Sequence, residues 1–360
     1  MLKEGAAVLV KVVTSMRRKQ SGGDFDEKKR WKIRRNVLLS CMSYMFLLVA
    51  SRFYASTGRI EIRTVYTCGY AFPEFARATL PEYEVAPYIK DVIPGPGDIV
   101  LIGMHGACDT SHVRSYASNS RVVYLNGEPS AGGMIEGSFY LGPPDTSIQP
   151  DIKQLKFAYV QMVVLELPIA FEIFEYRLRY HKNKSNKFLI YASSRCFQHR
   201  EDALNILSTV DRVSCAGKCH GSLKNYENVT ESGGKQGNRG WKEVHKLFAG
   251  YKFCLVMENT NTSWYITEKI LTAFIAGCVP IYFGTKDVFT FFNHNAFVYF
   301  DPSHPQKATE QVRKLHNSET EYFKMLSQPV LAPGASKNLF SLFHDRKGRF
   351  AMEIRRFLEL

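Results

Sequence analysis

Tyr251-Lys-Phe-Cys-Leu-Val-Met257 is a run of mostly apolar residues, and Val279-Pro-Ile-Tyr-Phe283 is a second such run further along the chain. Each run has the length of a buried β-strand. Between them, apolar residues recur at the spacing of one helical face and predict a helix over 267–276: Ile266, Ile270, Leu271, Phe274 and Ile275. A strand, a helix and a strand in this order predict two parallel strands of an α/β sheet, joined by a right-handed crossover.

The alternation of strands and helices extends in both directions from this segment. Further strands are predicted at 60–66, 98–102, 121–125 and 187–192, and further helices at 201–210, 241–248, 307–326 and 338–360. The strands are continuously apolar, as in parallel sheets that are covered on both faces. A polar break at 182–187 divides the pattern, so we predict an N-terminal α/β domain over 56–181 and a C-terminal one over 182–335, with a cleft between them. The amphipathic segment 336–360 is expected to pack on the protein body.

The first 35 residues are strongly basic. They hold eleven Lys and Arg against four Asp and Glu, which is +7 of the net charge of +13. Such a tail can bind nucleic acid, but interleaved aromatic residues and nucleic-acid motifs are missing, so we expect no nucleic-acid partner.

An uncharged run, Val37–Ala50, follows the tail directly. Because positive residues gather on the cytosolic side of a membrane span, we predict a cytosolic tail over 1–35, a signal-anchor over 36–55 and a lumenal remainder. This is a single-pass type II arrangement. The run is shorter than an ordinary span, so a cleaved signal peptide and a buried core helix remain as alternatives.

Eight cysteines are spread along the chain, one of them in the predicted anchor, so at least one of the other seven is unpaired. Cys215 and Cys219 suggest a zinc site, a local or longer disulfide, or unpaired thiols, and no second pair of zinc ligands is visible. Glycosylation sequons begin at Asn183, Asn228 and Asn261. We expect Asn228 to be accessible and Asn261 to be unused.

Candidate functional residues follow three of the predicted strands. Glu128 follows 121–125, Glu258 and Asn259 follow 251–257, and the segment 193–200 follows 187–192. In parallel α/β sheets ligands bind outside the carboxyl ends of the strands, so these residues mark the expected site.

Lys269 lies in the first turn of the helix predicted over 267–276, for which Thr267 is the expected N-cap. A cation there opposes the positive end of the helix dipole, whereas an anion is favoured. A bound phosphate group would resolve this conflict, and a solvated surface lysine is the alternative. We expect Lys269→Ala to lose affinity for the phosphate-bearing ligand with little loss of folding.

Together these residues resemble the signature of the α1,3/α1,4-fucosyltransferase family. The resemblance lies in Tyr251–Asn259, Tyr265-Ile-Thr-Glu-Lys269 and Gly277–Gly284, with weaker matches at 192–204 and near Cys219. It is firm over about 187–325 and fades in the N-terminal half. It implies a GT-B-like fold of two Rossmann-like domains, a Golgi membrane location, and GDP-fucose as the donor.

The resemblance also assigns roles to residues. Lys269 and Arg200 would hold the diphosphate, and Glu268 would contact fucose and favour positive charge on its ring. Glu258, Asn259, Tyr265 and Thr267 would belong to the donor site. Glu128 aligns with the carboxylate proposed as general base, which an inverting reaction needs opposite the leaving group. Glu128 and Glu268 are thus the predicted catalytic residues.

No metal site is predicted, because the single Asp-x-Asp of the sequence, Asp24-Phe-Asp26, lies in the predicted cytosolic tail. No cofactor is expected to be required, with a divalent cation as a possible stimulant. The expected acceptor is a glycoprotein glycan, fucosylated at the 3-hydroxyl of N-acetylglucosamine, with the N-glycan core favoured. Outer-chain N-acetyllactosamine and a non-catalytic glycan-binding relative are the alternatives. Nothing in the sequence indicates an oligomeric state.

Overall fold

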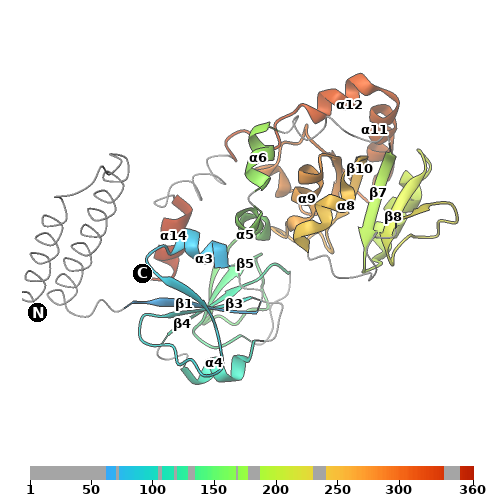
Figure 1. Ribbon diagram of the computed structural model, residues 1–360. Coiled ribbons are helices and arrows are strands. Elements are labelled where there is room, and N and C mark those ends of the chain that lie inside the picture. The colour runs from blue at the N-terminus through green and yellow to red at the C-terminus, as the bar shows by residue number, and fades with distance from the viewer. Residues whose placement is uncertain are drawn as a thin grey trace, which may run out of the picture. The chain divides into compact units, whose positions relative to one another are not determined.

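The computed structural model describes residues 62–69, 73–103, 108–116, 120–128, 134–167, 169–176, 187–229, 241–335 and 349–360. The predicted tail and signal-anchor, and the sequon at Asn183, lie outside these residues. Among the described residues, no helix combines the length and apolarity that a membrane crossing requires. All described helices and strands belong to one unit, Arg63–Leu360 (Figure 1).

The first sheet has six parallel strands in the order β2-β1-β3-β4-β5-β6. Their bounds are β1 Thr64–Cys68, β2 Glu84–Pro87, β3 Ile99–Gly103, β4 Arg121–Leu125, β5 Phe139–Gly142 and β6 Lys153–Lys156. All five residues of β3 are buried, as expected for a strand covered on both faces. The strands predicted at 60–66 and 98–102 are confirmed with shifted ends.

Helices cover both faces of the first sheet. α3 (Pro73–Thr79) and α14 (Arg349–Phe357) lie on one face, and α4 (Thr110–Tyr116) lies on the other (Figure 1). Ile354 and Leu358, in and just after α14, are buried against the side chains of β1, β3 and α3. The expected packing of the C-terminal segment on the protein body is therefore confirmed for the part that is described.

The second sheet also has six parallel strands, in the order β12-β11-β10-β7-β8-β9. Their bounds are β7 Lys187–Ser193, β8 Val213–Gly217, β9 Glu227–Asn228, β10 Tyr251–Met257, β11 Val279–Phe283 and β12 Val298–Tyr299. Counted along the chain within this sheet, the order reads 3-2-1-4-5-6, which is that of a dinucleotide-binding domain. The order reverses between β7 and β10, and a ligand is expected there.

The connecting helices are α7 Gln198–Leu207, a 3₁₀ turn Trp241–Glu243, α8 Val244–Phe248, α9 Glu268–Ala276, α10 Val288–Phe291, α11 Pro305–Asn317 and α12 Glu319–Leu326. The prediction of a single helix over 307–326 is wrong, because α11 ends at Asn317 and α12 begins at Glu319, with Ser318 between them. The Ser318 hydroxyl accepts a hydrogen bond from the backbone N–H of Glu321 and so begins a new helix.

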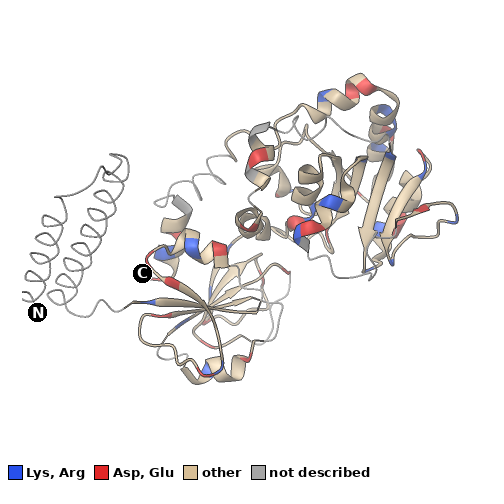
Figure 2. Cartoon of the chain, in the orientation of Figure 1, with Lys and Arg blue, Asp and Glu red and all other residues tan. Residues whose placement is uncertain are grey.

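Two helices between the sheets connect the halves of the structure. α5 (Tyr159–Glu166) and α6 (Ile169–Tyr176) fall within the N-terminal domain predicted over 56–181, yet most of their buried side chains pack around α9 of the second half. Met162 of α5 instead contacts the core of the first sheet. The boundary predicted near 182 lies outside the described residues. Charged side chains fall mainly on helices, loops and strand ends, which leaves both sheet interiors apolar (Figure 2).

Candidate active site

A cavity of about 510 Å³ lies where the strand order of the second sheet reverses. Its walls come from the ends of β7 and β10, from α8 and the start of α9, and from the loop after β4. The charged residues on these walls are Arg195, Arg200, Lys269, Glu128 and Glu268. Three cations and two carboxylates therefore share one cavity.

Arg200 is held in α7 with its guanidinium at the end of β10. Its Nη2 donates to Asn259 Oδ1 at 2.6 Å and its Nη1 to Ser193 Oγ at 3.4 Å. The ring of Phe197 lies 4.9 Å from the guanidinium carbon. Nε is buried without a hydrogen-bond partner within the described residues. Burial lowers the pKa of Arg200 while nearby Tyr and Glu side chains oppose that shift, and a guanidinium keeps its charge at neutral pH.

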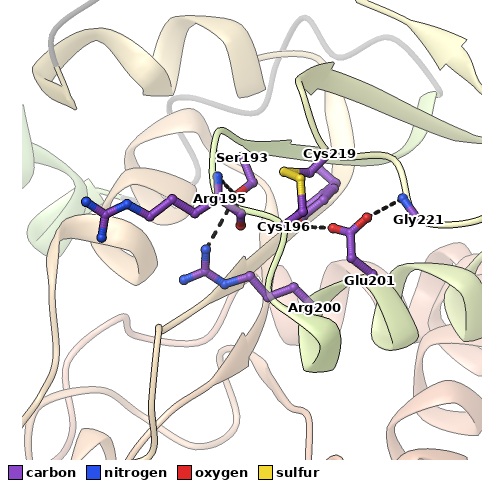
Figure 3. Close-up of a disulfide and its surroundings, with 8 residues drawn as sticks. Ser193, Arg195, Cys196, Arg200, Glu201, Cys219 and Gly221 are labelled. Atoms are coloured by element: carbon purple, nitrogen blue, oxygen red, sulfur yellow. Dashed lines mark hydrogen bonds between the residues drawn. A yellow bond between two sulfur atoms is a disulfide. The ribbon is translucent and has the colours of Figure 1, made fainter.

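The disulfide Cys196–Cys219 ties the loop after β7 to the loop after β8 (Figure 3). Glu201 reinforces this link, since its carboxylate accepts from Tyr191 Oη at 2.9 Å and from the backbone N–H of Gly221. In Figure 3 the side chains of Arg195 and Arg200 extend to the same side, away from the disulfide. The crosslink thus anchors the segment that carries both cations.

The zinc alternative for Cys215 and Cys219 is wrong. Cys215 lies within β8, is buried and has a free thiol, whereas Cys219 pairs with Cys196. Burial raises the pKa of the Cys215 thiol to about 12. Cys196, Glu201 and Cys219 lie close enough to suggest a metal cluster, but both sulfurs are consumed by the disulfide.

A buried carboxylate, Glu258, organises the start of α9. It accepts hydrogen bonds from the Thr267 backbone N–H at 2.7 Å and from the Thr267 hydroxyl at 2.8 Å. Thr267 occupies the N-cap position as predicted, but its side chain makes no capping hydrogen bond. Instead, Glu258 supplies the negative charge that this helix end favours.

Lys269 Nζ lies 3.2 Å from Glu258 Oε2 and 3.6 Å from Glu268 Oε1. Burial lowers the pKa of Lys269, but the two carboxylates outweigh it and the net shift is upward. Burial raises the pKa of Glu258, and Lys269 opposes that rise. The lysine side chain is 26% exposed, whereas Glu258 is fully buried. Lys269 is therefore a stable cation that faces the cavity.

Glu128 enters the cavity from the first sheet. It follows β4, and its backbone N–H donates to Asn126 Oδ1 at 2.8 Å. Its Oε2 accepts from Tyr265 Oη at 2.9 Å and from Asn259 Nδ2 at 3.3 Å. Gly127 is required beside it, because a Cβ there would lie 2.3 Å from the Tyr159 ring. The carboxylate is thereby held against the cationic wall.

Known proteins resemble both the sequence of the second half and the fold of the described chain. Residues 181–327 match the family described as Glycosyltransferase family 10 (fucosyltransferase) C-term. The matched stretch makes up nearly all of the C-terminal domain, which we call the family 10 domain for this similarity. An alpha-(1,4)-fucosyltransferase of Arabidopsis thaliana is 34% identical over 33% of this chain and 32% of that protein. An alpha-(1,3)-fucosyltransferase of Helicobacter pylori is 33% identical over 31% of this chain and 24% of that protein.

Other relatives carry a different name. The GDP-fucose protein O-fucosyltransferase 3 of Xenopus tropicalis is 31% identical over 29% of this chain and 23% of that protein. The matched part of the chain thus spans about a quarter to a third of these relatives. A crystal structure of an alpha1,3-fucosyltransferase aligns with 85% of this chain and 93% of its own, with a TM-score of 0.51 and 14% identity. That likeness shows the fold of two Rossmann-like GT-B domains.

The predicted site residues of the family 10 domain come together in two layers. Arg200, Asn259, Glu268 and Lys269 line the cavity, and Glu128 reaches it from the other sheet. Glu258, Thr267 and Tyr265 are buried behind them and are not part of its wall. These three residues contact the ones that form the wall, and their predicted part in donor binding stays a prediction.

Arg195 is a cavity cation that the sequence argument did not single out. It is exposed and follows β7 in the family 10 domain, next to Ser193, whose hydroxyl donates to the Arg195 carbonyl at 2.9 Å. Its position just after β7, a strand at the reversal of strand order, could have indicated that Arg195 lies at the site. The apolar wall formed by Val244, Leu247 and Phe248 of α8 carried no comparable signal.

Proposed function

We propose that this protein is an inverting fucosyltransferase that uses GDP-fucose as donor and the 3-hydroxyl of N-acetylglucosamine as acceptor. One observation carries the proposal: a single cavity joins Lys269 and Arg200 of the family 10 domain to Glu128 of the opposite sheet. Cations for a leaving group and a carboxylate for an incoming hydroxyl are what such a transfer requires.

The donor fits the distribution of charge and apolar surface. Lys269 and Arg200, with Arg195 beside them, provide positive charge for the diphosphate at the strand-order reversal. The apolar side chains of α8 on the same cavity offer a wall for the nucleoside. A solved alpha1,3-fucosyltransferase that shares the fold was crystallised with GDP-fucose.

The proposed reaction is a single displacement. Glu128 takes the proton of the acceptor hydroxyl as its oxygen attacks C1 of fucose on the face opposite the diphosphate. The bond between C1 and the β-phosphate oxygen breaks, and its electron pair leaves with GDP. Lys269 and Arg200 offset the charge that develops on the diphosphate. Glu268, also on the cavity wall, favours positive charge on the fucose ring.

Two acceptor classes are supported by different observations. The family signature in the second domain favours N-acetylglucosamine of a glycoprotein glycan, and we place it in the N-glycan core. The second candidate is a Ser or Thr hydroxyl of a protein, favoured by relatives named GDP-fucose protein O-fucosyltransferase 3.

We also propose a Golgi location with a type II anchor over 36–55. The three disulfides Cys68–Cys108, Cys196–Cys219 and Cys254–Cys278 support a lumenal position, because the secretory pathway is oxidising. We expect detergent to extract the whole protein from microsomes and alkaline carbonate to leave it in the membrane.

The test is a transfer assay with the full chain. GDP-fucose, GDP-mannose and UDP-galactose would each be offered with a core N-glycan, N-acetyllactosamine and a Ser/Thr peptide, and the product linkage determined by NMR. We expect α-linked fucose from GDP-fucose alone, and Glu128→Gln should abolish transfer while GDP-fucose still binds. Transfer from another donor, or a β-linked product, would contradict the proposal.

A further inference from the structure

We propose that Tyr265 and Asn259 are positioning residues that fix the Glu128 carboxylate for proton abstraction, and that Arg200 fixes the orientation of Asn259. This inference rests on the proposed function, in which Glu128 is the base. In this inference, Tyr265 and Asn259 position the base and are not primarily contacts of the donor.

The hydrogen bonds form a continuous chain across the cavity wall. Arg200 Nη2 donates to Asn259 Oδ1 at 2.6 Å, and Asn259 Nδ2 donates to Tyr265 Oη at 2.9 Å. Tyr265 Oη then donates to Glu128 Oε2 at 2.9 Å. Asn259 Nδ2 also reaches Glu128 Oε2 directly, at 3.3 Å. The chain therefore runs from the cation at the leaving group to the base.

The direction of each hydrogen bond follows from the chemistry of the two ends. A guanidinium can only donate and a carboxylate can only accept. A flipped Asn259 amide would put its NH₂ group against Arg200 and its oxygen against Glu128, which are two repulsive contacts. Tyr265 has a single hydroxyl proton, and because Asn259 already donates to its oxygen, that proton goes to Glu128. Hydrogen bonds aligned in one sense strengthen one another.

The burial of Tyr265 indicates that it positions the base and does not contact the donor. Tyr265 is fully buried and its hydroxyl is used in both directions by Asn259 and Glu128. Burial, followed by the negative charges of Glu258 and Glu128, raises the pKa of Tyr265, so the hydroxyl keeps the proton it donates. Tyr265 therefore acts on the base from behind the cavity wall.

Other charged and titratable groups also surround Glu128. Tyr159 of α5 and Tyr265 both interact electrostatically with it. Glu268 and Lys269 of α9 and Arg200 of α7 share the cavity with it. The hydrogen bonds from Tyr265 and Asn259 hold the Glu128 carboxylate in one orientation among these groups, so their loss should misplace the base.

The test compares the full chain with Tyr265→Phe and Asn259→Asp. Tyr265→Phe removes one hydroxyl, and Asn259→Asp keeps the acceptor for Arg200 but replaces the donating NH₂ with a carboxylate oxygen. Tyr322→Phe is the matched control, because it also loses one donated hydrogen bond, to the Lys252 carbonyl at the far end of β10. Thermal unfolding of each variant establishes that it is folded.

For Tyr265→Phe we expect GDP-fucose affinity within about twofold of the parent and kcat about tenfold lower or more, since a misplaced base loses much of its effect. The loss should thus fall on kcat and not on donor binding. Asn259→Asp should likewise lower kcat while GDP-fucose still binds, and Tyr322→Phe should match the parent chain.

Unchanged kcat in both variants would overturn the inference. Weaker GDP-fucose binding with kcat unchanged would also overturn it and would mean that the two residues contact the donor directly. If Tyr265→Phe does not fold, Asn259→Asp alone decides by the same criteria. A parent chain that neither binds GDP-fucose nor transfers fucose would instead overturn the proposed function, and the inference with it.

Discussion

Replacing Lys269 by Met leaves the Glu258 carboxylate buried without its cation. Glu258 is fully buried and its Oε2 lies 3.2 Å from Lys269 Nζ. Breaking a buried ion pair from one side costs about 3–5 kcal/mol. The hydrogen bonds from Thr267 remain and the lysine side chain is 26% exposed, so we expect a loss of about 2–3 kcal/mol. Lys269 variants should therefore lose stability as well as donor affinity, contrary to the expectation from sequence.

The loss of stability in Lys269→Met should be smaller at low pH than at high pH. The folded-state pKa of Glu258 is already raised above its ordinary value, mainly by burial, and loss of Lys269 removes a group that lowers it. A carboxyl group with a raised folded-state pKa favours folding below its unfolded-state pKa and opposes it as pH rises through the folded-state value. Lys269→Met should thus be destabilised less at pH 5 than at pH 8.

Urea unfolding under non-reducing conditions, at pH 5 and pH 8, measures this effect. The control is the double variant Lys269→Met with Glu258→Gln, in which position 258 carries no charge that would be left without an ion-pair partner. At pH 8 we expect the free energy of unfolding of the double variant to exceed that of the single variant by at least about 1 kcal/mol. Equal losses at both pH values, together with strict additivity in the double variant, would refute the reasoning.

Three further predictions concern the loops around the site. Replacing both cysteines of the Cys196–Cys219 disulfide by Ser opens a crosslink spanning 23 positions; stability should fall by about 2–4 kcal/mol and the Kd for GDP-fucose should rise, as urea unfolding and calorimetry would show. An unchanged Kd would mean that the crosslink does not hold the cationic segment. Gly127→Ala places a Cβ 2.3 Å from a tyrosine ring, so kcat should fall at least about tenfold with donor binding retained; unaltered kcat would contradict the tight fit. In the glycosylated protein, intact-mass analysis should find a glycan at Asn228 and none at Asn261, and occupancy at Asn261 would count against the position of the site.

Local patterns in the sequence were sufficient for the second sheet. The strands 251–257 and 279–283 occur as predicted, and the helix between them begins one residue later than expected. These elements depend on apolar spacing, which is visible in a short window. The break at Ser318 was also visible, because Ser318-Glu-Thr-Glu321 is a Ser-x-x-Glu helix start that the longer apolar pattern obscured.

Contacts between distant segments could not be predicted in this way. Tyr265 and Glu128 are 137 positions apart, and their hydrogen bond depends on how two sheets meet. The pairing of Cys196 with Cys219 likewise depends on two loops that follow neighbouring strands. Glu258 follows a strand, as site residues do, but position alone does not tell whether its side chain faces the cavity or the core.

The packing of α14 against the first sheet has a consequence for synthesis. The core of the first half includes Ile354 and Leu358, which the ribosome adds long after β6 and after the whole second sheet. The first sheet therefore cannot complete its core while the chain is growing, whereas the second sheet contains all its strands once residue 299 has emerged. The half that is made first should be the half that finishes folding last. Its unfinished apolar surface is then the part of the nascent chain most exposed to chaperones.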